Sequence, residues 1–227
     1  MTVQLTKKIL FFSSIFVLFV LTACSNNANQ YLLEDVYVNE SDISISLLTI
    51  EIDELYSQFP NHEFGALRPT ERRVFNEQLI QLFASNTRSH VTGKLSTSAL
   101  LEHPFQERSF NLRNSTLTMI APEQGTVVRN GSDKSRFVVV LDKFYFTQYQ
   151  VQVGGDTYAG HEGEMERRLR FDTKYLIWDN EKRDAIAWGK IETNEALNQS
   201  NQTETYRSLV LDAFRRIIQH SPFSPSA

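Results

Sequence analysis

The chain has 227 residues, of which 41% are hydrophobic and 22% charged, and its formal net charge is -4 at pH 7. This balance excludes a basic nucleic-acid-binding surface and argues against nonspecific adhesion to anionic lipid. Because Cys24 is the only cysteine, a disulfide framework within the chain is excluded as well. The roughly 200 residues after it are enough for one domain with its own core.

The first 23 residues have the composition of a secretory signal peptide. Lys7 and Lys8 precede an apolar run over 9–21, and small residues then lead to Cys24. The run is shorter than the roughly 20 apolar residues that a membrane-spanning helix needs. We therefore predict a signal peptide over residues 1–23. The alternative is an ordinary secretory signal with a cysteine nearby by chance.

The tetrapeptide Leu21-Thr22-Ala23-Cys24 resembles the lipobox of bacterial lipoproteins. The resemblance implies lipidation of the Cys24 thiol, cleavage before it and acylation of the new amino terminus. Two or three acyl chains give a stable membrane anchor. In Gram-negative lipoproteins, serine after the cysteine, here Ser25, permits export to the outer membrane. For such a source we expect a lipid anchor in the outer membrane, with the domain facing the periplasm.

Residues 24–41 are predicted to be the lipidated cysteine and a polar tether. The stretch 25–30 has no apolar pattern and is typical of a flexible segment. If 24–41 were fully extended, the domain could stand up to roughly 50 Å from the lipid. Residues 31–38 contain enough apolar side chains to dock on the domain, which would shorten this reach.

The next part of the chain predicts three strands and one helix. Thr70 is a suitable N-cap for the helix, and Glu71 suits the positive end of its dipole; the helix is expected to end near Asn86. Residues 96–112 are ambiguous and include one short helical turn before Pro104. The strands are expected at 42–52, 88–95 and 115–121, from apolar alternation or short apolar runs.

The C-terminal part has the strongest strand pattern. A long strand is predicted over 136–153, and the change of pattern after Asp142 indicates a bulge. The alternating strands 166–178 and 184–192 then complete a meander. An amphipathic helix over 202–220 follows. We predict an α+β fold over 42–220: a single domain with a mixed sheet, a C-terminal antiparallel three-strand meander and two principal helices packed on one face. Residues 221–227 are predicted to be a disordered tail.

Motifs for catalysis or cofactor binding are lacking in the sequence. The five histidines are scattered without metal-ligand spacing, and no Gly-x-Ser-x-Gly elbow is present. The glycine-containing loop 154–163 lacks the ending of a phosphate loop. Glu162, Glu164 and Glu166 are expected to form a solvated face; paired carboxylates for glycoside cleavage are the alternative. We therefore expect no catalytic residues, no metal and no cofactor, and hence no enzyme.

Aromatic residues are numerous along the predicted meander. We expect most of them to pack beneath the helices, and the alternative is an exposed aromatic surface for a partner. Three residues are the candidates for partner contact: Tyr158 in the glycine-containing loop, and Trp178 and Trp188 on or beside the meander strands.

The meander resembles a pattern in periplasmic lipoproteins related to the TolB amino-terminal domain. The matching segments are Tyr175-Leu176-Ile177-Trp178-Asp179 and, after a polar turn, Ala185-Ile186-Ala187-Trp188-Gly189-Lys190. The group includes activators of penicillin-binding proteins and auxiliary lipoproteins of lipid transporters. The resemblance implies a non-enzymatic, membrane-tethered component that binds an envelope protein and no nucleic acid. An auxiliary transport lipoprotein with a hydrophobic groove and an unrecognised envelope hydrolase are the alternatives.

Overall fold

The computed structural model describes most of the chain after residue 101 and several shorter segments before it. The predicted signal peptide, Cys24 and Tyr158 lie outside the described residues. The described residues are 29–33, 43–49, 80–87, 89–95, 102–129, 135–155, 163–197, 200 and 202–224.

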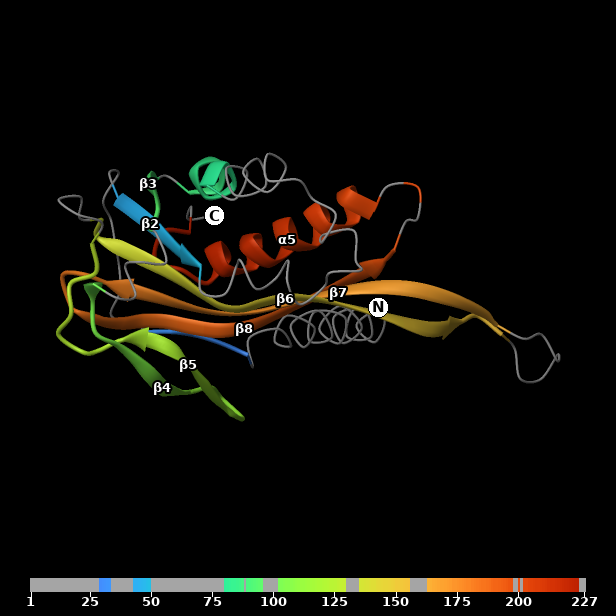
Figure 1. The fold of residues 1–227 in the computed structure, drawn as a ribbon, viewed down its shortest axis with the longest axis horizontal. Helices are drawn as coiled ribbons and strands as arrows, with labels where there is room; N and C mark the ends of the chain where they lie inside the picture. The colour runs from blue at the N-terminus through green and yellow to red at the C-terminus, as the bar shows by residue number, and fades with distance from the viewer. Residues whose placement is uncertain are drawn as a thin grey trace, which may run out of the picture.

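The described strands form two sheets of different size (Figure 1). The large sheet has six strands in the order β1-β8-β7-β6-β2-β3. Strand β2 runs parallel to both β3 and β6, and the remaining pairs are antiparallel. Its strands are β1 (Gln30–Leu32), β2 (Ile43–Thr49), β3 (Ser89–Lys94), β6 (Phe137–Val153), β7 (Glu164–Asp179) and β8 (Asp184–Ala196). The second sheet is a two-stranded ribbon of β4 (Phe105–Asn111) and β5 (Thr116–Pro122).

The predicted α+β fold class is wrong, because the described residues are mostly β, with 55% strand and 20% helix. The three C-terminal strands are antiparallel neighbours, but they do not form the predicted meander with two principal helices packed on one face. They are central strands of the large sheet, since β6 also pairs with β2, and β8 with β1. Strand β4 lies within the ambiguous segment 96–112, for which no strand was predicted. The expected pair of principal helices reduces to one long helix, α5 (Gln202–Gln219), and a short described segment over 80–86.

Two hydrophobic cores lie on opposite faces of the large sheet. Helix α5 packs on β7 and β8 at one face, and the β4–β5 ribbon packs on the other (Figure 1). Successive residues of β6 alternate between the cores: Val139 points toward α5, whereas Val138 and Val140 point toward the ribbon. A strand buried on both faces reads as a continuous apolar run, which explains the apolar stretch 137–141. The bulge predicted after Asp142 is confirmed by a register shift there.

The turn between β7 and β8 is fixed by buried polar side chains. Asn180 accepts a hydrogen bond from the Val128 backbone N–H (2.8 Å) and donates to the carbonyls of Val128 (2.8 Å) and Ser135 (2.6 Å). Arg183 has a φ of 54°, and its carbonyl accepts a hydrogen bond from the Gly125 N–H at 2.9 Å. The turn thereby joins the sheet to the segment that follows the ribbon.

Both ends of the described chain are docked on the domain. Residues 29–33, inside the predicted tether, include strand β1, which pairs with β8. At the other end, Phe223 is 4% exposed, and its ring lies 5.9 Å from that of Phe137. The described residues 221–224 therefore do not behave as the predicted disordered tail.

Candidate interaction surface

The outer ends of β6 and β7 form a projecting two-stranded ribbon, here called the arm, made of residues 149–153 and 164–167. Strand β8 pairs with β7 only as far as Arg168, whereas β6 and β7 remain paired out to Val153 and Glu164. The arm extends beyond α5 and β8 at one end of the molecule (Figure 1). Hydrogen-bonding edges without a neighbouring strand are templates for pairing with another chain.

Glycines shape the end of the arm. A Cβ at Gly163 would lie 2.5 Å from the carbonyl oxygen of Gly154 and 2.8 Å from that of Val153, so no larger residue fits there without movement. Gly154 and Gly155 have φ values of 69° and 89°, in the region that favours glycine. The sequence thus allows the two strands to approach closely right up to the loop.

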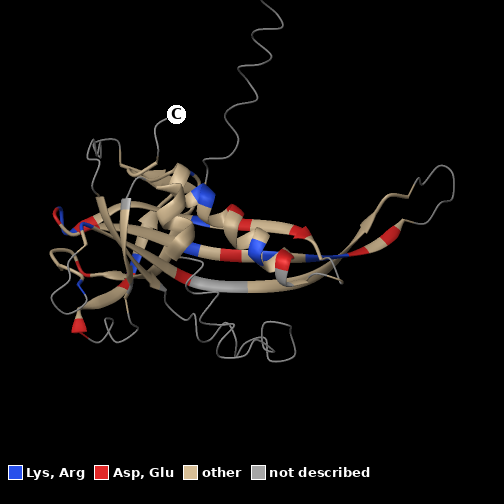
Figure 2. Ribbon diagram, turned by 90° about the horizontal axis from the view of Figure 1, so that it is seen from above, with Lys and Arg blue, Asp and Glu red and all other residues tan. Residues whose placement is uncertain are grey.

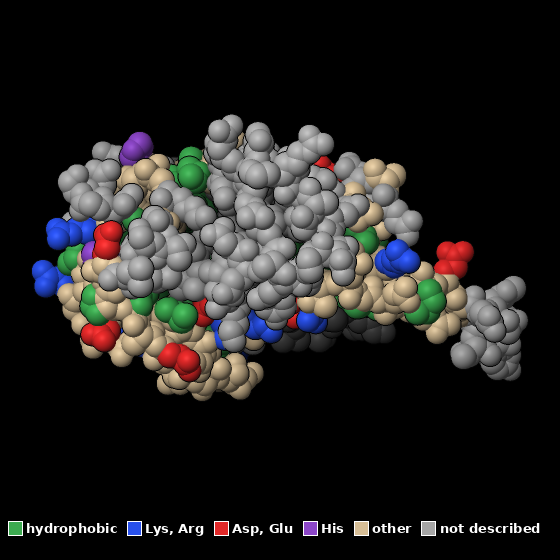
Figure 3. Space-filling model, viewed as in Figure 1, with side chains coloured by type: hydrophobic (Ala, Val, Ile, Leu, Met, Phe, Trp, Pro, Cys, Tyr) green, Lys and Arg blue, Asp and Glu red, His purple; other side chains and the backbone are tan. Residues whose placement is uncertain are grey.

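The arm carries two of the three exposed large hydrophobic residues among the described residues. Met165 is 61% exposed and Val153 is 37% exposed. The two side chains lie on opposite faces of the arm, because Met165 pairs with Gln152 and Val153 is the next residue along. Figure 3 shows a hydrophobic side chain between basic and acidic ones on this part of the surface. A partner strand or clamp could therefore contact apolar groups on either face.

Basic and acidic residues alternate along the strands leading to the arm, as the ribbon colours in Figure 2 show. On the face opposite α5, Asp172 is 1% exposed; its Oδ2 accepts a hydrogen bond from Arg170 Nε (2.8 Å), and Lys190 Nζ lies 3.8 Å from its Oδ1. Burial raises the pKa of Asp172, while the Arg170 charge opposes this rise. The described residues contain no group of three potential metal ligands. The charges of Arg170 and Lys190 are suited to position the Asp172 carboxylate electrostatically.

A cluster of hydroxyl groups lies where β2 meets β3 and β6. Ser46 Oγ shares hydrogen bonds with Thr92 Oγ1 (2.8 Å) and with Ser135 Oγ. Thr92 Oγ1 also donates to the Ile45 carbonyl at 3.2 Å. We assign these contacts a structural role, because they connect neighbouring strands on each side of β2.

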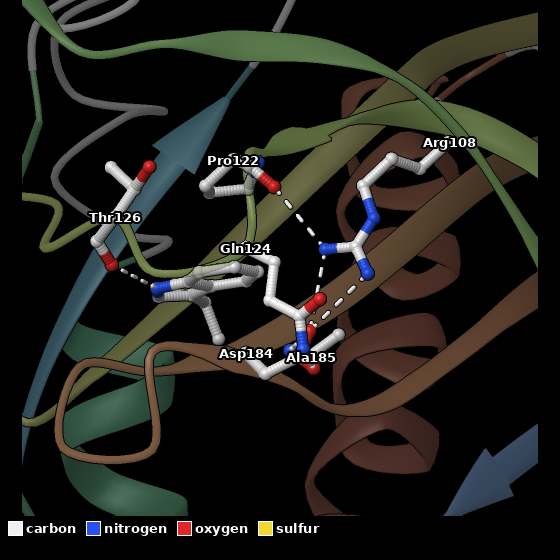
Figure 4. A network of polar contacts seen from close by, with 7 residues as sticks. Arg108, Pro122, Gln124, Thr126, Asp184 and Ala185 are labelled. Atoms are coloured by element: carbon white, nitrogen blue, oxygen red, sulfur yellow. Dashed lines mark hydrogen bonds and ion pairs between the residues drawn. The ribbon is translucent and has the colours of Figure 1, made fainter.

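The prediction that Trp178 contacts a partner is wrong, because its side chain is fully buried. Its indole Nε1 donates a hydrogen bond to the Thr126 carbonyl at 3.2 Å, and the Arg108 guanidinium lies 5.9 Å from its ring centre (Figure 4). The residue belongs to the interface between the large sheet and the ribbon. The sequence placed it on a strand but gave no sign of the ribbon that covers it.

Polar contacts also link the large sheet to the β4–β5 ribbon (Figure 4). Arg108 donates from both terminal nitrogens to Asp184 Oδ1 (3.3 Å each) and from one of them to the Pro122 carbonyl (3.3 Å). Gln124 Nε2 donates to Asp184 Oδ2 at 2.9 Å. These contacts tie both strands of the ribbon to the start of β8, which supports a structural role for this charged group.

Trp188 is half-buried in an aromatic stack. Its ring stacks on Tyr31 of β1, with a centroid distance of 4.6 Å and an interplanar angle of 22°, and lies 5.1 Å from Phe110 of β4. Its Nε1 donates to the Asn111 carbonyl at 2.9 Å. Tyr31 is the outermost member of the stack at 41% exposure. The surface predicted at Trp188 is thus occupied by β1, and Tyr31 faces outward in its place.

Three exposed hydrophobic residues, Tyr31, Val153 and Met165, were missed as candidates in the sequence. A usable signal existed for Val153 and Met165, since each lies beside the glycine-containing loop at the end of a long strand. For Tyr31 no signal existed, because its exposure depends on the pairing of β1 with a strand far along the chain.

No protein-family profile matches the chain, and no curated protein sequence matches it. A solved structure from Helicobacter pylori, described as a homologue of the neuraminyllactose-binding hemagglutinin, is similar over 89% of this chain and 88% of its own. The sequence identity is 9% and the TM-score 0.37, so this likeness carries no argument about function. Within the described residues, no helix is long and apolar enough to cross a membrane.

Proposed function

We propose that this protein is a lipid-anchored, non-enzymatic component of a bacterial envelope that binds a protein partner through the β6–β7 arm. The proposed anchor is Cys24, at the end of a segment with the composition of a signal peptide. The observation that carries the proposed binding role is the arm, a projecting ribbon that exposes Met165 and Val153.

The arm supports this role because its features do not serve the fold in the described structure. A two-stranded ribbon is only marginally stable by itself in water, and exposed edge strands are usually blunted or covered. An arm that exposes Met165 and Val153 gains stability when a partner covers it. A few residues carry most of the binding energy of an interface, and Met165 and Val153 are the exposed large hydrophobic side chains that the arm offers.

In-cell photo-crosslinking tests this proposal. A photoreactive residue at Gln150 of the arm should give a defined crosslinked envelope protein, whereas one at Glu195, an exposed position near the end of β8, should not. The double substitution Val153→Ser and Met165→Ser should weaken binding about 30-fold or more, because loss of the two apolar side chains costs at least about 1 kcal/mol each.

The matched control replaces Glu195 and Ala196, which are exposed at the end of β8, with serine. This pair should leave the crosslink unchanged. Equal crosslinking from positions 150 and 195, or a crosslink at 150 that survives the arm substitutions, would contradict binding through the arm.

A further inference from the structure

Strand β1 is held to the β8 edge by several independent contacts. The Asn29 carbonyl accepts a hydrogen bond from the Lys190 N–H (2.9 Å), and the Leu33 N–H donates to the Ile186 carbonyl (2.9 Å). Gln30 Nε2 donates to the hydroxyl of the buried Tyr175 at 2.9 Å. Together with the stacking of Tyr31 on Trp188, these contacts fix residues 29–33 on the edge of β8.

The fit between β1 and β8 requires a glycine at position 189. A Cβ there would lie 2.7 Å from Tyr175 Cε1, 2.8 Å from the Asn29 carbonyl oxygen and 3.0 Å from Gln30 Cγ. Gly189 pairs directly with Gln30. The backbone of β1 therefore approaches β8 at a place where no larger residue is accommodated.

The position of β1 limits the number of residues that separate the proposed anchor from the domain. Five Cα–Cα steps separate Cys24 from Asn29, and a fully extended chain of this length spans at most about 17 Å. We propose that β1 acts as a short leash, holding the β1–β8 edge, with Tyr31 at its surface, against the bilayer in which the lipid on Cys24 is inserted. This inference rests on the proposed lipid anchor.

The leash restricts the kind of partner that the arm can reach. Along β7, Glu164 lies eleven residues from Tyr175, which pairs with Gly189, a distance of roughly 36 Å at 3.3 Å per residue. Leash and arm together reach roughly 50 Å from the lipid. The partner is therefore a protein embedded in, or lying close to, the same membrane.

Tyr31 suits a surface that faces lipid headgroups. Its ring packs on Trp188 on one side and is 41% exposed. Tyrosine has an apolar body and a polar tip, and it is enriched where protein meets the bilayer interface.

Two insertions of the same length, one on each side of β1, test the leash. A Gly/Ser segment of about 20 residues is placed either between Ser25 and Asn29 or within 34–42, in the full lipidated chain reconstituted into phosphatidylethanolamine–phosphatidylglycerol vesicles. Energy transfer from a dye on Glu195→Cys to a labelled lipid reports the height of the domain. The first insertion should raise the domain by roughly 20 Å or more, and the second should leave its height unchanged.

A third variant releases the leash without lengthening the chain. Gly189→Val should displace β1 through the contacts described above, so that the domain rises and the insertion within 34–42 now raises it further. Ala196→Val, an exposed position on the same strand, is the control and should leave the height unchanged.

The outcomes separate this inference from the proposed function. Equal increases in height from the two insertions in the wild-type background would overturn the leash and leave the anchor intact. A chain that stays soluble after expression with its signal peptide, as a Cys24→Ala chain should, would overturn both the anchor and the leash. Failure of the arm crosslink alone would overturn partner binding through the arm and leave the leash standing.

Discussion

Asp172 is a carboxylate in a nearly fully buried position of the large sheet. Burial raises its pKa above the ordinary value of 3.8, and the nearby charge of Arg170 offsets part of that rise. The folded state therefore holds the proton more tightly than the unfolded chain does. The resulting contribution to stability is full below the unfolded pKa and is lost as pH rises through the folded pKa.

We predict that Asp172→Asn stabilises the protein at pH 7, because the amide avoids the cost of burying a charge. The gain in the free energy of unfolding should be about 1.4 kcal/mol for each unit by which the pKa is raised, and it should disappear below pH about 4. Urea unfolding over a pH series measures this. Asp212→Asn, on the surface of α5, should change stability by less than about 0.5 kcal/mol. A loss of stability at pH 7 in the Asp172 variant would contradict the prediction.

The sequence shows on which face of its strand Asp172 lies, but it does not show how deeply the side chain is buried. The alternation along 166–178 predicts that Leu169, Phe171, Tyr175 and Ile177 share a face, and these four residues do lie in the core on the α5 side. Asp172 and Trp178, on the opposite face, are buried as well. Their burial depends on segments distant in the sequence, which the periodicity of one strand does not contain.

At the scale of elements, β6 is supported differently along its length. Residues 137–141 lie between β2 and β7, whereas residues 149–153 in the arm pair with β7 alone. Local stability follows the density of buried contacts around a backbone segment. The two ends of this single strand should therefore differ in how readily they open.

Hydrogen exchange followed by NMR or mass spectrometry tests this difference. Amides of 149–153 should exchange at least about 100-fold faster than those of 138–141, because the arm opens without breaking the core. Residues 187–189 of β8, which pair with both β1 and β7, serve as a protected control. Uniform protection along β6 in the purified protein would contradict the picture of an uncovered arm.

The elements that the sequence predicted well are those with a strong internal pattern. The stripe of α5, including Tyr206, Val210 and Phe214, is buried as expected, and the bulge after Asp142 is present. Strand β4 was missed because only Phe110 among its seven side chains is buried. A strand with so few buried side chains shows no clear alternation of apolar and polar residues in the sequence. The ribbon forms because it packs on a face of the large sheet.

At the scale of the whole molecule, the two sheets depend on each other. The chain has two tryptophans, and both lie where the ribbon meets the large sheet: Trp178 contacts Thr126, and Trp188 contacts Phe110 and Asn111. Tryptophan emission therefore reports on ribbon docking, while far-UV circular dichroism reports mainly on the large sheet and α5.

We predict that the two signals change together in urea, with midpoints that agree within experimental error. A two-stranded ribbon has little stability when undocked, and the large sheet would expose an apolar face without it, so neither should unfold alone. An earlier midpoint for tryptophan emission would show that the ribbon detaches first and would contradict this coupling. Thr118→Ala, a half-buried ribbon position, provides a control in which both midpoints should shift equally, if at all.

The contact between β1 and β8 has a consequence for the order of events as the chain is synthesised. Gln30 of β1 and Tyr175 of β7, which share a hydrogen bond, are 145 residues apart in the sequence, and β8 follows β7, so β1 emerges long before these strands exist. A chain is made and translocated from its amino-terminal end. Under the proposed lipid anchor, Cys24 would be modified during that interval, before β1 has a strand to pair with. Once β8 has folded, β1 docks, and Cys24 is then only five residues from a fixed position of the domain.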